Sequence, residues 1–310
     1  MQLITDTKII VSLFVFAIMA FTVQEVNAQG KLVSWGEDNR GQVSNTPTGN
    51  DFIDASAGYY HSVAFREDGS LVAWGTDSDN QVSDTPSEKE FINVAAGSNH
   101  NVALRKNGTL VYWGWDFTIN DDYAMGDVPI RDGFVAVSAA GNHSLALHED
   151  GSISAWGWNI NGVVSDTPKG NDFVAISAGA HHNLALREDG SVAAWGDDMF
   201  GSVDDIPDEK GFIAIETGAR HSIALREDGS ITAWGWDLKN EVSDTPSDKG
   251  FKEVSIGYTH SMAIKEDGSI IGWGWERNKA GQLEQIPAKK GFIKISAGWF
   301  HNIAIQKVFE

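Results

Sequence analysis

Seven histidines recur along this chain and are the residues best suited to carry chemistry, because imidazole binds metals and exchanges protons near neutral pH. They stand at one position of a sequence repeat. In the ring of repeats that is predicted below, equivalent residues are spread apart and do not converge on a single site. We therefore predict that these histidines are structural and are held by hydrogen bonds, as buried polar groups usually are. They are His61, His100, His143, His182, His221, His260 and His301.

A second recurring set is acidic and follows a tryptophan-glycine pair in each repeat. It consists of Asp38, Asp77, Asp116, Asn159, Asp198, Asp237 and Glu276. Such a ring could bind a cation, but Asp and Asn side chains also cap turns, and we favour capping. The sequence contains no calcium loop, phosphate loop, serine elbow or zinc-binding helix motif. We therefore predict no catalytic residue, no metal site and no cofactor, and we expect that the protein is not an enzyme.

The elements that position these residues belong to one unit, repeated about every 39 residues. In one unit, three short apolar runs predict strands at 173–179, 182–187 and 191–196. The Asp189-Gly190 pair between the last two predicts a two-residue hairpin turn in which both positions favour positive φ. Each unit also carries a tryptophan that we expect to pack between neighbouring sheets. These structural tryptophans are Trp35, Trp74, Trp113, Trp156, Trp195, Trp234 and Trp273.

Seven such sheets predict an all-β fold, a seven-bladed β-propeller built from short repeats of about 39 residues. The chain carries a lone third strand at 31–35 and ends with a lone first and second strand at 292–296 and 301–305. We therefore predict that the last blade is closed by the N- and C-terminal strands. In six units a glycine such as Gly58 stands three residues before the histidine, where we expect it to permit a tight turn.

The N-terminus has the features of a secretory signal peptide. An apolar run at 9–21 follows Lys8 and precedes a small residue, Ala28. We predict that residues 1–28 are removed and that residues 29–310 form one propeller domain, secreted or periplasmic. The apolar run is too short to span a bilayer, so no stable membrane insertion is expected. A net charge of −20 argues against a nucleic-acid partner, and the absence of cysteine excludes disulfides.

The repeats also resemble a known family. The pattern Ala-Gly-x-x-His-Ser-x-Ala-Leu-x-x-Asp-Gly-x-x-x-Ala-Trp-Gly, which residues 57–75 match almost throughout, resembles the repeats of the regulator-of-chromosome-condensation superfamily. This resemblance extends over residues 31–305. The short units and the signal peptide make the chain most similar to the secreted propeller-type β-lactamase inhibitory proteins. The resemblance implies seven blades, a split last blade and binding to an enzyme through one face of the ring, without catalysis.

The candidate binding residues lie where the repeats differ, at the two positions before each histidine. Three units that become neighbours in a closed ring carry aromatic residues there, which predicts a continuous surface suited to a protein-binding hot spot. In the resembling inhibitors, aromatic residues at these turns contact the bound enzyme. We call this set the aromatic arc: Tyr59, Tyr60, Tyr258, Trp299 and Phe300. Further candidates on the same face are Trp115, Phe117, Tyr123, Trp158, Trp236 and Trp275.

The predicted function is that of a secreted, non-enzymatic, monomeric propeller that binds an extracellular protein. The resemblance implies that this partner is an enzyme, for which a β-lactamase is the leading example. The alternative is a carbohydrate-binding or cell-surface adhesion module, because aromatic rings also stack on sugars, and its partner would be a glycan. The acidity of the chain predicts that a basic partner would associate faster, with strong salt dependence.

Overall fold

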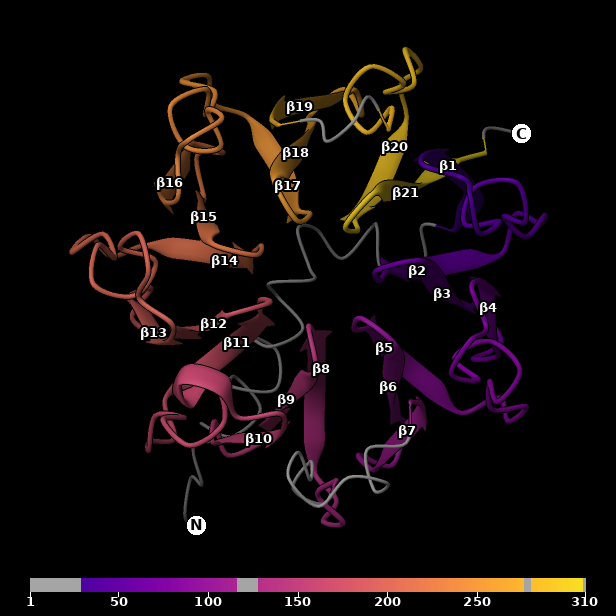
Figure 1. The fold of residues 1–310 in the computed structure, drawn as a ribbon, viewed down its shortest axis with the longest axis horizontal. Coiled ribbons are helices and arrows are strands. Elements are labelled where there is room, and N and C mark those ends of the chain that lie inside the picture. Colours follow the sequence, from indigo (N-terminus) through magenta and orange to yellow (C-terminus); the bar gives the residue numbers. More distant parts are fainter. Residues whose placement is uncertain (1–28, 116–127, 276–279, 309–310) are drawn as a thin grey trace, which may run out of the picture.

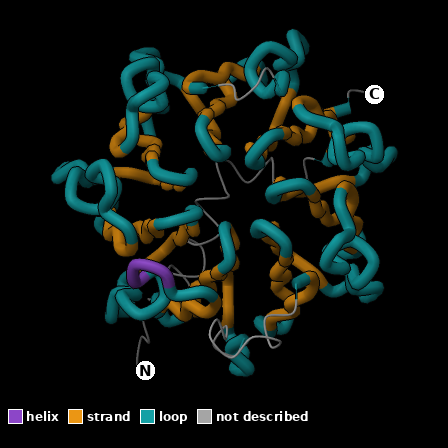
Figure 2. The backbone as a smooth tube through the Cα atoms, in the orientation of Figure 1, coloured by secondary structure: helices purple, strands orange, loops and turns teal. Residues whose placement is uncertain are grey.

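The computed structural model describes residues 29–115, 128–275 and 280–308, and within them the fold is all-β. Short antiparallel strands are joined by loops, and the one helical segment in these ranges is the 3₁₀ turn η3 (Ile160–Gly162) (Figure 2). The described residues contain no helix long and apolar enough to cross a membrane. The predicted signal peptide, residues 1–28, lies outside the described residues.

Each repeat contributes a first, a second and a third strand, and the sheets surround a central axis with the first strands innermost (Figure 1). The first strands are β2 (Phe52–Ala57), β5 (Phe91–Ala96), β8 (Phe134–Ala140), β11 (Phe173–Ala178), β14 (Phe212–Thr217), β17 (Phe251–Ile256) and β20 (Phe292–Ala297). The second strands are β3 (His61–Arg66), β6 (His100–Arg105), β9 (His143–His148), β12 (His182–Arg187), β15 (His221–Arg226), β18 (His260–Lys265) and β21 (His301–Lys307). The third strands are β1 (Gly30–Gly36), β4 (Leu71–Gly75), β7 (Leu110–Gly114), β10 (Ile153–Gly157), β13 (Val192–Gly196), β16 (Ile231–Gly235) and β19 (Ile270–Gly274).

The first and last described strands lie side by side. Strand β1 pairs with β21 in an antiparallel ladder that runs from Gly30 opposite Lys307 to Gly36 opposite His301. Strand β21 also pairs with β20, whereas β1 meets β2 only at Gly30. A third strand from the start of the chain therefore shares a sheet with a first and second strand from its end, next to the second strand.

The hairpins at the Asp-Gly pairs differ from the sequence-based prediction. In the turn between β3 and β4, Gly69 has a φ of 80°, but Asp68 does not have a positive φ. The amide of Gly69 donates to the carbonyl of Arg66, and the Asp68 carboxylate accepts hydrogen bonds from the amide and hydroxyl of Ser70. The turn is therefore of type I followed by a left-handed glycine, in which the aspartate caps the chain beyond it instead of adopting positive φ.

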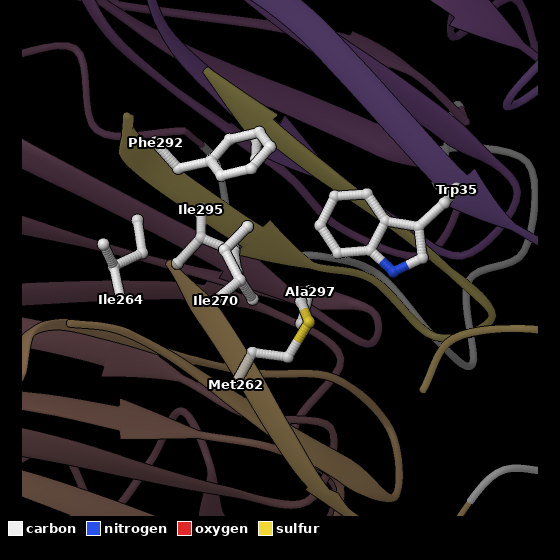
Figure 3. Packing of buried hydrophobic residues seen from close by; sticks show 8 residues of the cluster. Trp35, Met262, Ile264, Ile270, Phe292, Ile295 and Ala297 are labelled. Atoms are coloured by element: carbon white, nitrogen blue, oxygen red, sulfur yellow. The ribbon is translucent and has the colours of Figure 1, made fainter. Parts of the chain in front are cut away.

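Apolar side chains from adjacent repeats form the cores between the sheets. In one cluster Trp35 from the first described strand packs with Met262, Ile270, Phe292 and other residues of the last two repeats (Figure 3). The seven structural tryptophans are all buried. Burying large aromatic side chains in this way supplies much of the favourable free energy of such a fold.

Most of these tryptophans also fix the loop of the preceding repeat. The indole Nε1 atoms of Trp35, Trp74, Trp113, Trp195, Trp234 and Trp273 donate to the carbonyl oxygens of Gln282, Gln42, Gln81, Val163, Ser202 and Glu241, respectively. Each third strand is therefore tied to the loop that follows the third strand before it.

One of the buried residues in these loops carries a charge. Glu241 is fully buried, its Oε2 accepts from the amide of Lys239, and its Oε1 has no partner among the described residues. Burial raises the pKa of this carboxyl. Gln81 fills the same place in its own loop and accepts from the amide of Asp79 in the same way.

We expect the substitution Glu241→Gln to stabilise the fold by about 1 kcal/mol at pH 7, because an amide keeps the hydrogen bond to Lys239 without burying a charge. Since the pKa is raised in the folded state, the cost of ionisation is present at high pH and disappears below the unfolded-state value. The gain should therefore shrink as the pH falls towards 4. Urea unfolding at pH 7 and pH 4.5 measures it, and Gln81→Glu, the reverse change in another repeat, should destabilise.

Candidate binding surface

The seven recurring histidines link each repeat to the next. All are buried, and each Nε2 lies 2.6–2.9 Å from a side-chain oxygen on the second strand of the following repeat. The pairs are His61–Asn101, His100–Ser144, His143–Asn183, His182–Ser222, His221–Ser261, His260–Asn302 and His301–Ser62. Equivalent histidines therefore do not converge, and each is occupied by a hydrogen bond between repeats.

The asparagine links show which atom carries the proton. The Nδ2 of Asn101 donates to the carbonyl of Gln81 at 3.0 Å, so its Oδ1 must accept from Nε2–H of His61. This arrangement suits a neutral imidazole. Burial lowers the pKa of His61 to about 4, and that of His100 to about 3. A neutral ring needs no charged partner in the interior, which explains why serine and asparagine suffice.

The glycines before these histidines serve a different purpose from the predicted tight turn. The backbone of Gly58 is not left-handed, but a side chain there would lie 2.5 Å from the carbonyl oxygen of Gly97 and 2.7 Å from the ring of His61. The glycine is required because neighbouring repeats and the histidine approach its backbone closely. In the third unit, where Ala140 replaces the glycine, Gly141 has a φ of 49° and the local path differs.

The recurring acidic side chains that follow the tryptophan-glycine pairs bind backbone amides of their own loops. Oδ1 of Asp77 accepts from the amides of Val82 and Ser83 at 2.8 and 2.9 Å. The neutral Asn159 makes the same pair of bonds in its repeat, so a negative charge is not required there. Asp38, Asp198 and Asp237 bind the equivalent amides, whereas Asp116 and Glu276 lie outside the described residues. No group of three or more potential metal ligands gathers within the described ranges.

A cluster of mixed charge lies on the innermost strands. Lys294 on β20 pairs with Glu253 on β17 at 3.4 Å. On the neighbouring strand β14, burial and the nearby charge of Glu253 raise the pKa of Glu216 to about 8. Because a lysine already neutralises this cluster in part, it is a poor place for a metal ion.

The aromatic arc brings together rings from three repeats. The ring centroids of Tyr59 and Trp299 are 4.3 Å apart, and those of Trp299 and Tyr258 are 4.4 Å apart. Tyr60 lies 4.1 Å from Tyr59 and 5.4 Å from Phe300. Residues from the first repeat and the last two therefore form one contiguous aromatic cluster.

Within the arc the five rings are not equally accessible. Phe300 is only 5% exposed and supports the others, whereas Tyr59, Tyr60, Tyr258 and Trp299 are partly exposed. The amide of Trp299 donates to the carbonyl of Gly58 at 3.2 Å, which fixes this turn against its neighbour. The arc thus combines partly exposed rings with a rigid backbone, which lowers the entropic cost of binding.

The remaining candidates are distributed over several repeats. Trp115 is 37% exposed and Trp158 is half-buried. Trp275 is half-buried with the Nζ atom of Lys239 5.8 Å from its ring centroid. Phe117 and Tyr123 lie outside the described residues. Trp275 is therefore joined to the turn of Tyr258 through hydrogen bonds with Thr259, whereas Trp115 and Trp158 belong to other repeats than those of the arc.

A group of exposed residues on this surface was missed at the level of sequence. The loop after β13 exposes Met199 and Phe200, at 50% and 45%, and the loop after β16 exposes Leu238 at 69%. The ring of Phe200 stacks on Trp236 at 5.9 Å, and Arg220 lies against both rings. The sequence feature that could have revealed this group is the adjacent apolar pair Met199-Phe200, because the same positions in the loops of the other repeats are mostly polar.

The repeat pattern and the geometry above correspond to a known family. The sequence profile of the regulator of chromosome condensation (RCC1) repeat matches residues 52–81, 91–117, 134–163, 173–201, 212–240 and 251–282, more than half of the chain. This chain belongs to the RCC1 repeat family. The matched RCC1 repeats each begin at the phenylalanine of a first strand and extend beyond the end of the third strand.

Solved structures support the RCC1-type propeller fold. The chain is similar to Prp20p from Saccharomyces cerevisiae, with 17% identity and a TM-score of 0.73 over 100% of this chain and 97% of that one. It is similar to human WBSCR16, with 15% identity and a TM-score of 0.72 over 91% and 100% of the two chains. The CRINKLY WD40 ectodomain of the receptor kinase ACR4 from Arabidopsis thaliana shares 23% identity and a TM-score of 0.64 over 83% and 94%. None of the curated proteins matches the sequence.

We expect the free energy of unfolding to fall as the pH is lowered from 7 towards 4, because of the buried histidines. In the unfolded chain each imidazole takes up a proton near pH 6.5, whereas the folded pKa values of about 3 to 4 keep it neutral. The unfolded state then binds more protons, and each histidine contributes a slope of up to about 1.4 kcal/mol per pH unit.

Calorimetric unfolding at pH 5.5 in buffers of different ionisation enthalpy measures this proton uptake. The variant His182→Gln, whose amide can still donate to Ser222, should take up about one proton fewer. An unchanged uptake in this variant would show that the histidine is already charged in the folded protein.

Proposed function

We propose that this RCC1-family propeller is a protein-binding module that uses the aromatic arc as its contact surface. The observation that carries the proposal is the continuous contact of partly exposed rings from three repeats. Clusters of tyrosine and tryptophan are the residues in which the binding free energy of protein interfaces concentrates. Prp20p, which shares the fold, is described with binding properties to Gsp1p and histones.

We further propose that the ring has seven blades and that the last blade consists of β20, β21 and β1. The ladder between β1 and β21 and the hydrogen bond between His301 and Ser62 support this arrangement. Residues 29–310 would then be one domain in which both ends share a sheet. Such closure would stabilise the ring without disulfides, in keeping with a chain that lacks cysteine.

We also propose where the protein acts and which kind of partner it binds. The apolar run before Ala28 supports export, so the mature protein would be secreted or periplasmic and would meet its partner there. The resemblance to the propeller-type inhibitory proteins supports an extracellular enzyme, such as a β-lactamase, as the target. In this role the propeller would block its partner and would not itself catalyse a reaction.

Capture of partners from the producing cell's own extracellular medium on the purified protein tests the proposal, followed by titration against a panel of β-lactamases. We expect Trp299→Ala to weaken binding of the captured protein by about 30-fold, or about 2 kcal/mol, as for a central hot-spot residue. Trp115→Ala, an exposed tryptophan in another repeat, is the matched control and should change affinity little.

Two outcomes would contradict the proposal. If Tyr59→Ala, Tyr258→Ala and Trp299→Ala all left the captured partner's affinity unchanged, the arc would not be the contact surface. If a glycan array gave binding that is lost in Trp299→Ala while no protein was captured, the protein would be a carbohydrate-binding module. An absence of inhibition at micromolar concentration would exclude the β-lactamases of the panel but leave protein binding to be judged by the capture.

A further inference from the structure

Arg220 occupies an unusual place beside the aromatic arc. It is the last residue of the turn before His221, and its guanidinium carbon lies 5.5 Å from the ring centroid of Phe200 and 5.8 Å from that of Trp236. These two rings stack at 5.9 Å with an interplanar angle of 28°. The guanidinium therefore sits against two aromatic faces, which hold it in position through cation–π attraction.

The polar atoms of this group are not satisfied within the described part of the chain. The Nε of Arg220 and the Nε1 of Trp236 are both buried N–H donors with no hydrogen-bond acceptor. Buried donors without acceptors cost free energy and are uncommon in folded proteins. Two of them in contacting side chains leave this group without the acceptors that a packed site normally supplies, and an acceptor from outside would reach it through the partly exposed guanidinium of Arg220.

Other arginines in the described ranges, unlike Arg220, pair with a carboxylate of the same repeat. Arg66 pairs with Asp51, and Arg187 binds both carboxylate oxygens of Asp172 at 2.7 and 2.8 Å. Arg220 has no such carboxylate among the described residues. Asp197, whose charge acts on the neighbouring His181, accepts through Oδ1 from the amide of Met199 at 2.9 Å.

The loop that supplies Phe200 is held in a costly conformation. Phe200 has a φ of 76°, and the other non-glycine residues with positive φ in the described ranges are all asparagines. A bulky residue in the left-handed region costs about 1–2 kcal/mol relative to the right-handed one. Such strain is typically retained where it serves a binding site, and here it places the ring against Arg220 and Trp236.

We propose that Arg220, Phe200 and Trp236 form a carboxylate-binding subsite that receives an aspartate or glutamate side chain of the partner protein. A guanidinium binds a carboxylate through two parallel hydrogen bonds, and partial burial between aromatic rings strengthens that pairing. His181 beside it does not compete as a cation, because burial and the charge of Arg220 lower its pKa. The site thus offers one fixed positive charge on a strongly acidic protein.

The position of the subsite favours a protein as the source of the carboxylate. The turn that carries Arg220 directly adjoins the turn of Tyr258, since a side chain on Gly218 would lie 2.6 Å from the carbonyl of Gly257. Trp275, from the same repeat as Tyr258, packs against Lys239 from the loop next to Trp236. A protein seated on the aromatic arc would therefore reach Arg220 with the edge of its interface. This inference rests on the proposed function for the identity of the ligand, but its chemistry can be tested without a partner.

The test uses the protein purified after export and labelled with ¹⁵N at tryptophan, with the indole signal of Trp236 assigned through Trp236→Phe. Two peptides are titrated at constant ionic strength: N-acetyl-Gly-Glu-Gly-amide and its glutamine counterpart. We expect the glutamate peptide to shift the Trp236 signal in a saturable manner and the glutamine peptide to leave it in place. In Arg220→Gln the affinity for the glutamate peptide should fall by about tenfold or more.

Three variants distinguish the contributions of the bidentate guanidinium of Arg220, of the Phe200 ring and of the overall charge of the protein. Arg220→Lys keeps the charge without the bidentate fork and should bind several-fold more weakly than the original. Phe200→Asn, which copies Asn161 of another repeat and tolerates the left-handed backbone, should also weaken binding. Arg226→Gln, which removes a guanidinium paired with Glu209 in the same repeat, is the matched control and should bind normally.

The inference is overturned if the glutamate peptide does not shift Trp236, or shifts it equally in Arg220→Gln. A response to glucuronate without a response to the glutamate peptide would overturn the protein source and identify an acidic sugar. Failure of this subsite is distinct from failure of the proposed function, because Trp299→Ala tests the arc with the captured partner and leaves Arg220 intact.

Discussion

The side-chain hydrogen bond between each buried histidine and the second strand of the next repeat holds successive sheets together, and the recurring features of the fold follow from it. It requires a neutral imidazole, a serine or asparagine in the following repeat, and a backbone close enough for only glycine to fit, as at Gly58. Each of these requirements recurs in nearly every unit. The repeats therefore share the same residues at these positions because each repeat makes the same contact with the next sheet.

This contact leaves the adjacent turn positions free to vary. The two residues just before each histidine differ widely in size and exposure, from the partly exposed Tyr59 and Trp299 to the buried Phe300. A pair such as Tyr59-Tyr60 can replace a pair such as Ser98-Asn99 without disturbing His61 or His100, which stay fully buried in both repeats. In this chain the residues that join neighbouring repeats are thus separate from the variable turn residues, and similarity in the first set says little about the second.

Much of the fold and of the aromatic arc could be predicted from the sequence because the same packing requirement recurs in every repeat. The strand positions, the burial of Trp74 and the contacts between Tyr59, Trp299 and Tyr258 follow from counting units around a ring. The subsite at Arg220 could not be found in this way, because its members come from a turn and two loops at different positions of the repeat. The conformation of Phe200 was equally hidden, since nothing in its residue type favours positive φ.

The pairing of β1 with β21 has a consequence for how the protein comes to be made. Strand β1 finds almost all of its backbone partners in β21, which is synthesised after all the other described strands, and it pairs with its sequence neighbour β2 at a single position. Until β21 arrives, the edge of β1 is exposed and available to other chains, which is a known route to aggregation. The slow step of assembly should accordingly be the pairing of β1 with β21, and a chaperone that shields the early edge would favour the native fold over oligomers.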